Sequence, residues 1–140
     1  MKRMLLIILV LFVVVQFITI KKVDENVDIS LEIKANEQVM SIFKKACYDC
    51  HSNEIKYPWY SSIAPFSWVI SGHIEEGRKA LNFSLWENYT LEQKSEHIKD
   101  IYRTVYAAMP LQSYLWLHDE ANLTKEERSL IRDWTGVRAK

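Results

Sequence analysis

Two cysteines and a histidine stand together in KKACYDCHSN, which covers residues 44–53. Cys47 and Cys50 are three positions apart, and His51 follows at once. This spacing suits three kinds of chemistry: a redox-active dithiol, part of a zinc site, or the covalent attachment of haem. Most of the function of the protein depends on which of the three applies.

The surroundings of the motif favour haem. A thioredoxin-like dithiol follows a strand, whereas this pair follows a helical pattern of apolar residues. A zinc ion needs four ligands, and the motif supplies at most three. In a CxxCH pattern, two thiols on one helical turn can each add to a vinyl group of haem, while the next imidazole binds the iron. The sequence therefore predicts one haem c, attached through Cys47 and Cys50, with His51 as proximal ligand.

A second axial ligand must come from elsewhere in the chain, unless the sixth position is vacant. Met109 is the main candidate because it precedes Pro110 at the end of a predicted helix, and a thioether raises the reduction potential of the iron. His73 and His118 are alternatives that would give bis-histidine iron. Arg78 is a candidate partner for a haem propionate, since guanidinium binds carboxylates through two hydrogen bonds. A surface charge explains Arg78 equally well.

The chain begins with the apolar run MLLIILVLFVVVQFITI over residues 4–20, interrupted by Gln16. Such a run is typical of a membrane anchor or a signal peptide. Its length, and the lack of an A-x-A-like cleavage site after it, favour an uncleaved anchor. We therefore expect an anchor or signal segment over 1–22, a linker over 23–35 and a haem domain over 36–140.

Composition favours a small all-helical domain after this run. Glycine and proline are scarce, with three residues each, which disfavours a β-sandwich or barrel. The 18 basic and 18 acidic side chains give a formal net charge of zero, so nothing indicates a nucleic-acid partner. Five tryptophans, seven tyrosines and five phenylalanines could fill a core or line a site for a flat aromatic ligand.

Apolar spacing predicts a helix over 36–46 that leads into the cysteines, and another over 66–80 that Gly72 and Gly77 weaken. Residues 81–89 read as a loop.

Two capping boxes predict the starts of two later helices. Thr90 with Gln93 opens the first, and Thr124 with Glu127 opens the second. We expect Pro110 to end the first helix and Gly136 to end the second.

Two resemblances follow from longer stretches of sequence. VMSIFKKACYDCH, the later AAMP and LTKEERSLIRDW resemble class I cytochromes c, which have a methionine ligand in a late loop and a C-terminal helix packed across the first. The stretch from CYDCH to NFSLW, with MPLQSYLWLH after it, resembles a family of small bacterial haem-binding domain proteins. In that family's motifs, His73 lies in GHIEEGR and His118 ends MPLQSYLWLH.

The resemblance covers roughly residues 36–136 and implies a cytochrome c-like domain around one covalent haem. It also implies a single-pass protein of the bacterial inner membrane, held in the bilayer by residues 4–20. Because haem is attached outside the cytoplasm, the domain would face the periplasm or the cell exterior.

The leading hypothesis for function is an electron carrier that passes single electrons between membrane-bound redox partners. A haem-based sensor or a binder of O2, NO or CO is the alternative. No acid–base pair or nucleophile constellation indicates an enzyme. Peroxidase-like activity, with His73 or Arg78 beside the haem, stays open.

Overall fold

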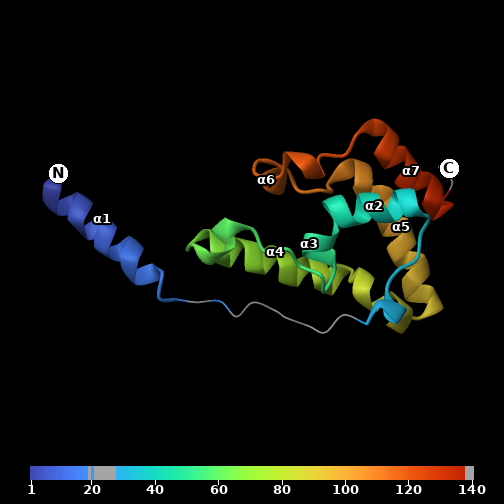
Figure 1. Cartoon of the computed structure of the whole chain (residues 1–140), viewed down its shortest axis with the longest axis horizontal. Helices are drawn as coiled ribbons and strands as arrows, with labels where there is room; N and C mark the ends of the chain where they lie inside the picture. The colour runs from blue at the N-terminus through green and yellow to red at the C-terminus, as the bar shows by residue number, and fades with distance from the viewer. Residues whose placement is uncertain (19, 21–27, 138–140) are drawn as a thin grey trace.

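The computed structural model describes residues 1–18, 20 and 28–137, and all regular secondary structure within these ranges is helical. Figure 1 shows α1 (Lys2–Val15) projecting away from a body of packed helices. The all-α class predicted from the sequence is confirmed for the described residues.

The body contains six α-helices and four short 3-10 helices among the described residues. The α-helices are α2 (Glu37–Ala46), α3 (Tyr48–His51), α4 (Phe66–Ala80), α5 (Leu91–Ala107), α6 (Gln112–Leu115) and α7 (Lys125–Thr135). The 3-10 helices are η1 (Ile29–Leu31), η2 (Trp59–Ser62), η3 (Phe83–Asn88) and η4 (Asp119–Ala121).

The predicted capping boxes are confirmed. At the start of α5, the backbone N–H of Gln93 donates to the Thr90 hydroxyl, and the side-chain oxygen of Gln93 accepts from the backbone N–H of Thr90. Thr124 and Glu127 make the same pair of bonds at the start of α7. Gly136 ends α7 with a φ of 65°, a left-handed conformation that glycine adopts at low cost.

The core forms where α2, α5 and α7 meet. Phe43 of α2 lies at its centre, stacked on Phe83 with ring centroids 4.9 Å apart and edge-on to Trp134 at 5.3 Å. Phe83 belongs to η3, in the segment predicted as a loop. That prediction was wrong: residues 81–89 contain a 3-10 helix whose buried side chains complete the core.

The predicted linker over 23–35 also enters the core at its end. Ile33 is only 1% exposed, and its N–H donates to the carbonyl of Phe83 at 2.9 Å. The folded domain therefore includes residues before Asn36. Residues 23–27 of the predicted linker, and 138–140 of the predicted domain, lie outside the described residues.

α1 exposes its apolar side chains along its whole length, and none of them is buried. Among the described residues, no helix has both the length and the apolar character that crossing a membrane requires. The structure therefore does not show the predicted spanning helix through 4–20. Residues 19, 21 and 22 of the predicted anchor segment lie outside the described residues.

Candidate functional site

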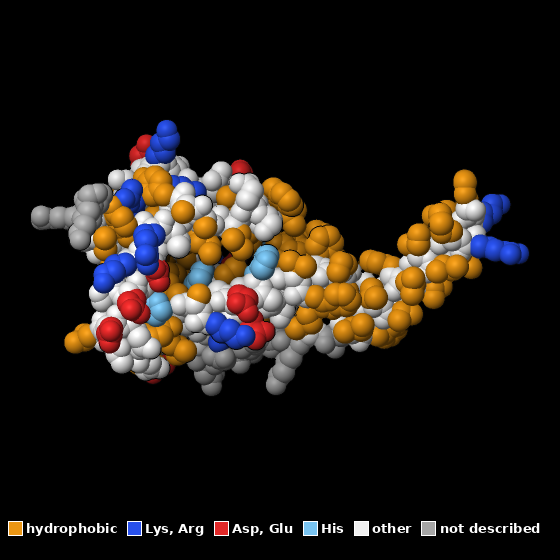
Figure 2. Space-filling model, turned by 180° about the vertical axis from the view of Figure 1, so that it is seen from behind, with side chains coloured by type: hydrophobic (Ala, Val, Ile, Leu, Met, Phe, Trp, Pro, Cys, Tyr) orange, Lys and Arg blue, Asp and Glu red, His pale blue; other side chains and the backbone are white. Residues whose placement is uncertain are grey.

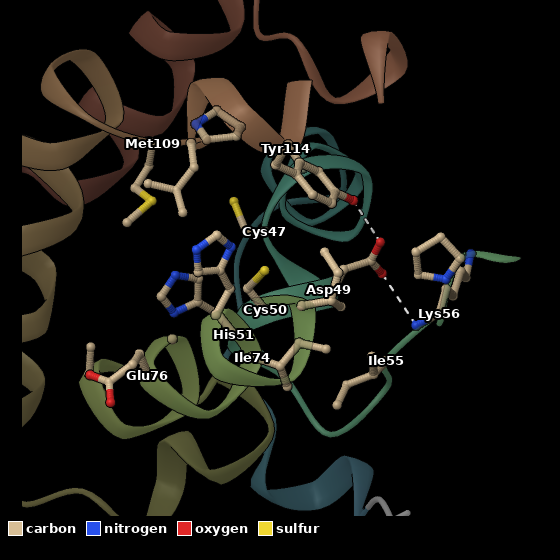
Figure 3. A pocket seen from close by; sticks show the side chains of 18 residues that line it. Cys47, Asp49, Cys50, His51, Ile55, Lys56, Ile74, Glu76, Met109 and Tyr114 are labelled. Carbon is tan, nitrogen blue, oxygen red and sulfur yellow. Dashed lines mark hydrogen bonds between the residues drawn. The ribbon is translucent and has the colours of Figure 1, made fainter. Parts of the chain in front are cut away.

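The cysteine–histidine motif forms a single helical turn directly after α2. Cys47 is the C-cap of α2. Its carbonyl accepts hydrogen bonds from the N–H groups of Cys50 at 3.2 Å and His51 at 2.9 Å. Figure 3 shows the sulfur atoms of both cysteines directed into one cavity, with Met109 reaching toward them from a different segment. Local hydrogen bonding thus places two thiols and an imidazole on the wall of the same cavity.

The His51 ring is oriented by a backbone carbonyl. Its Nδ1 lies 3.0 Å from the carbonyl oxygen of Leu81, so Nδ1 carries the proton and donates it. Nε2 is then the nitrogen whose lone pair can bind a metal, and this arrangement is usual for metal-ligating histidines. Burial lowers the pKa of His51, which favours the neutral ring that ligation requires.

The two thiols are held in their protonated form. Burial raises the pKa of Cys47 to about 12, with Cys50 nearby adding to the effect. Burial, followed by the charge of Asp49, raises the pKa of Cys50 to about 11. Redox-active dithiols need a lowered thiol pKa, and zinc binds thiolates. The raised pKa values therefore disfavour a redox dithiol, and zinc is disfavoured because the described residues contain no cluster of three or more side chains that could hold a metal ion.

Gly77 allows α4 to pack directly against the motif. A Cβ at position 77 would lie 2.5 Å from the carbonyl oxygen of Cys50, which is much closer than such atoms approach. The sequence indicated only that Gly77 weakens a helix. The structure shows a packing role for Gly77, because the turn that carries both thiols rests on this glycine. A Cβ at Gly72, earlier in the same helix, would meet nothing within 4 Å.

We expect Gly77→Ala to destabilise the haem-loaded protein by about 1–3 kcal/mol, because the added methyl group must displace the backbone of Cys50. Gly72→Ala is the matched control, and we expect it to stabilise the protein by about 0.5–1 kcal/mol. Denaturant unfolding of both variants and the wild type measures the difference. Equal stability of the two variants would show that contact at Gly77 does not position the motif.

Two neighbouring cavities meet at the motif, with volumes of about 320 and 220 Å³. They share five lining residues: Cys47, His51, Ala80, Met109 and Pro110. The remaining walls are mainly apolar, with Ile70 and Ile74 from α4 in the larger cavity and Phe83 and Ile101 in the smaller. An imidazole, a thioether and two thiols around apolar space form a donor set that fits haem.

Met109 lies two residues after the end of α5, and Arg128 of α7 holds this segment. The Arg128 guanidinium donates to the carbonyl of Met109 at 2.9 Å and to that of Val105, and its Nε donates to the carbonyl of Leu123 at 3.3 Å. One side chain thus joins α7, the end of α5 and the methionine segment. No sequence pattern pointed to Arg128, because its partners are backbone atoms of distant residues.

The other predicted site residues divide into two groups. His73 lines the larger cavity. His118 does not line either cavity. Its Nε2 forms a hydrogen bond with the Tyr60 hydroxyl at 2.6 Å, and its Nδ1 forms one with Glu120 at 2.9 Å. Its ring stacks on that of Tyr114. Arg78 also lines neither cavity. The structure therefore does not bring His118 and Arg78 to the positions expected of an iron ligand and a propionate partner.

Asn82 is a second residue that was not predicted from the sequence. It is 3% exposed, and its side chain donates to Asn53 at 2.7 Å and accepts from the N–H of Ser84 at 3.0 Å. These bonds tie the segment after His51 to η3. Leu81, whose carbonyl orients His51, directly precedes Asn82. The sequence shows only an asparagine before an aromatic residue, which is a weak signal.

A family model described as "Haem-binding domain" matches residues 10–136. The chain belongs to this family. Haem is therefore the cofactor that fits the cavity, and the chain is a haem-binding protein. Neither the curated proteins nor the solved structures include a significant match.

Proposed function

We propose that this haem-binding protein is a membrane-anchored c-type cytochrome that carries single electrons outside the cytoplasm. One observation carries the proposal: Cys47, Cys50 and His51 border the same cavity as Met109. Bound haem supplies one-electron redox chemistry, and the protein sets its ligands, exposure and potential. The helical domain around it would then be cytochrome c-like.

The cysteines support covalent attachment. Each protonated thiol would add across one vinyl group, with sulfur bonding one carbon and the thiol hydrogen going to its neighbour. No oxidant is needed. Because Cys47, Cys50 and His51 lie on one turn that α4 braces at Gly77, two thioether bonds and one axial bond would fix the ring in a single orientation.

We expect the chain, produced for export in a host competent in cytochrome maturation, to have the mass of the polypeptide plus one haem. The haem should stay with the chain in denaturant because thioether bonds hold it. The double variant Cys47→Ala/Cys50→Ala should lose this property. Mass spectrometry of both proteins is the measurement. A colourless wild type with the mass of bare polypeptide would contradict covalent attachment.

Met109 is the proposed distal ligand. Met109 lines both cavities, as His51 does. Its backbone is restricted by the hydrogen bond from Arg128 to its carbonyl and by Pro110, which follows it. A thioether opposite an imidazole favours ferrous iron, which suits a carrier that accepts and releases electrons at a raised potential.

We expect Met109→Ala to abolish the far-red charge-transfer band of ferric histidine–methionine haem and to lower the reduction potential. Met40→Ala is the matched control, since Met40 packs against the core and lines neither cavity. It should lose stability but keep the band. Absorption spectra and redox titrations distinguish the two. A wild type without the band would rule out Met109 as the ligand.

A haem-based sensor or small-ligand binder is the second candidate. The observation in its favour is His73, which lines the larger cavity and could donate a hydrogen bond to a bound gas. A carrier differs in having both axial positions of its iron filled. We propose no catalytic role for the protein. Peroxidase-like activity would need His73 or Arg78 beside the haem. Arg78 lies outside both cavities, which leaves only His73 for that role.

For an electron carrier, we expect carbon monoxide to produce little rapid spectral change in the reduced wild type, because Met109 occupies the position that the gas would take. Met109→Ala should respond at once. Stopped-flow absorption measures both. A rapid and complete response of the wild type would favour the sensor over the carrier.

Membrane anchoring forms the last part of the proposal. None of the apolar side chains of α1 is buried, and Phe17 and Ile18 after it are exposed as well, and lipid is the environment in which such a surface is stable. We propose that this segment holds the protein in the bacterial inner membrane, with the haem domain on the outer side. Tethering would raise the effective concentration of the domain near membrane-bound redox partners.

A further inference from the structure

An exposed apolar surface lies on the end of the haem domain that faces α1. Trp59 of η2 is 78% exposed, and Phe66 and Val69 of α4 are each 54% exposed. We call these three residues the docking patch. Figure 2 shows apolar side chains gathered along α1 and on the adjoining end of the body.

The chemistry of this surface suits a lipid interface. The segment from Tyr57 to Ile74 contains no aspartate, glutamate, lysine or arginine, although charged residues are frequent elsewhere in the domain. Single exposed apolar residues are ordinary, but an uncharged segment with several aromatic side chains is not. Tryptophan and tyrosine are the residues that gather at the boundary between lipid and water.

Hydrogen bonds hold the patch beside the end of α1. Gln16 donates to the carbonyl of Ala64 at 3.1 Å and accepts from its N–H at 2.9 Å. The indole N–H of Trp68 donates to the carbonyl of Ile18 at 3.3 Å. Gln16 interrupts the apolar run, and these bonds give both polar atoms of its side-chain amide a partner on the domain. The family match begins at residue 10, so it includes the end of α1 together with the domain.

We propose that the docking patch lies in the headgroup region of the bilayer that α1 enters, so that the haem domain rests on the membrane in one orientation. The inference rests on the proposed anchoring by α1. A lipid surface is favoured over a second copy because the patch adjoins the exposed apolar surface of α1, to which Gln16 and Trp68 connect it by hydrogen bonds.

This orientation would place the haem cavity close to the membrane. α4 connects the two, since Phe66 lies in its first turn and Ile70, His73 and Ile74 line the larger cavity. Ile70 follows Phe66 by one helical turn, an axial rise of roughly 6 Å. Ala80, the last residue of α4 at the cavity, lies about 21 Å along the same axis. Membrane-embedded redox partners would thus meet the haem from one fixed side.

The test uses the full-length, haem-loaded protein in phosphatidylcholine vesicles that contain a phosphatidylcholine with a photoreactive diazirine near the headgroup end of one acyl chain. After illumination, mass spectrometry locates the lipid-labelled peptides. We expect label on α1 and on the segment from Tyr57 to Ile74. Leu91, which is 86% exposed at the start of α5, should take up none, because α5 lies at the end of the body away from α1 (Figure 1).

Three variants sharpen the test, and the haem spectrum confirms that each is folded. Trp59→Ser should reduce labelling of the patch several-fold, whereas Leu91→Ser, a change at an exposed position on α5, should leave it unchanged. Gln16→Leu keeps the apolar run but removes both bonds to Ala64, so label on α1 should persist while label on the patch falls several-fold.

The outcomes separate the inference from the function on which it rests. A labelled α1 beside an unlabelled patch overturns the inference alone. An unlabelled α1 overturns the proposed anchoring. An unlabelled patch in a protein that is dimeric, and that Trp59→Ser makes monomeric, would identify the surface as an interface between copies. Patch labelling at the wild-type level in Gln16→Leu would show that Gln16 does not hold the domain at the membrane.

Discussion

The site depends on one hydrogen bond, from Nδ1 of His51 to the carbonyl of Leu81. This bond fixes the tautomer of the ring and leaves Nε2 available to iron. It also joins two parts of the domain, since His51 ends the helical turn of the motif and Leu81 directly follows α4. Two contacts nearby keep the Nδ1 donor of His51 within hydrogen-bond distance of the Leu81 carbonyl. Gly77 lets α4 approach the turn, and Asn82 ties the following residues to the segment after His51.

The protein assembles its cofactor site from two regions with different kinds of support. The cysteines and His51 lie on a turn whose geometry is set by its own backbone bonds and by contact with α4. Met109 lies in a short segment without regular structure, and Arg128 restrains it by bonding three carbonyls. A ligand in such a segment depends on a distant side chain for its position. In the proposed site, with Met109 as an iron ligand, the potential of the haem would be open to tuning from α7.

The proposed membrane contacts give the domain a direction as well as an anchor. The uncharged end of the domain and the end of α1 are joined by Gln16, and α4 runs from that end to the cavity. A domain held in this way would not sample all orientations at the end of a tether. An electron carrier gains from this constraint when its partners lie in the same membrane, because the haem is presented to them at a nearly constant distance.

Local interactions are the part of this protein that the sequence determined by itself. The capping boxes of α5 and α7, the left-handed Gly136 and the helical spacing before Cys47 depend on residues within one turn of each other, so pattern alone predicts them. The spacing of the motif likewise indicated haem, and the family match supports haem as the cofactor. Tertiary structure decided the rest. The contacts of Leu81, Gly77 and Arg128 each join residues far apart in the chain through a backbone atom of one partner, and no residue type signals such a contact. His118 and Arg78 show the converse, because chemically suitable side chains remained outside the cavity once packing had fixed their positions.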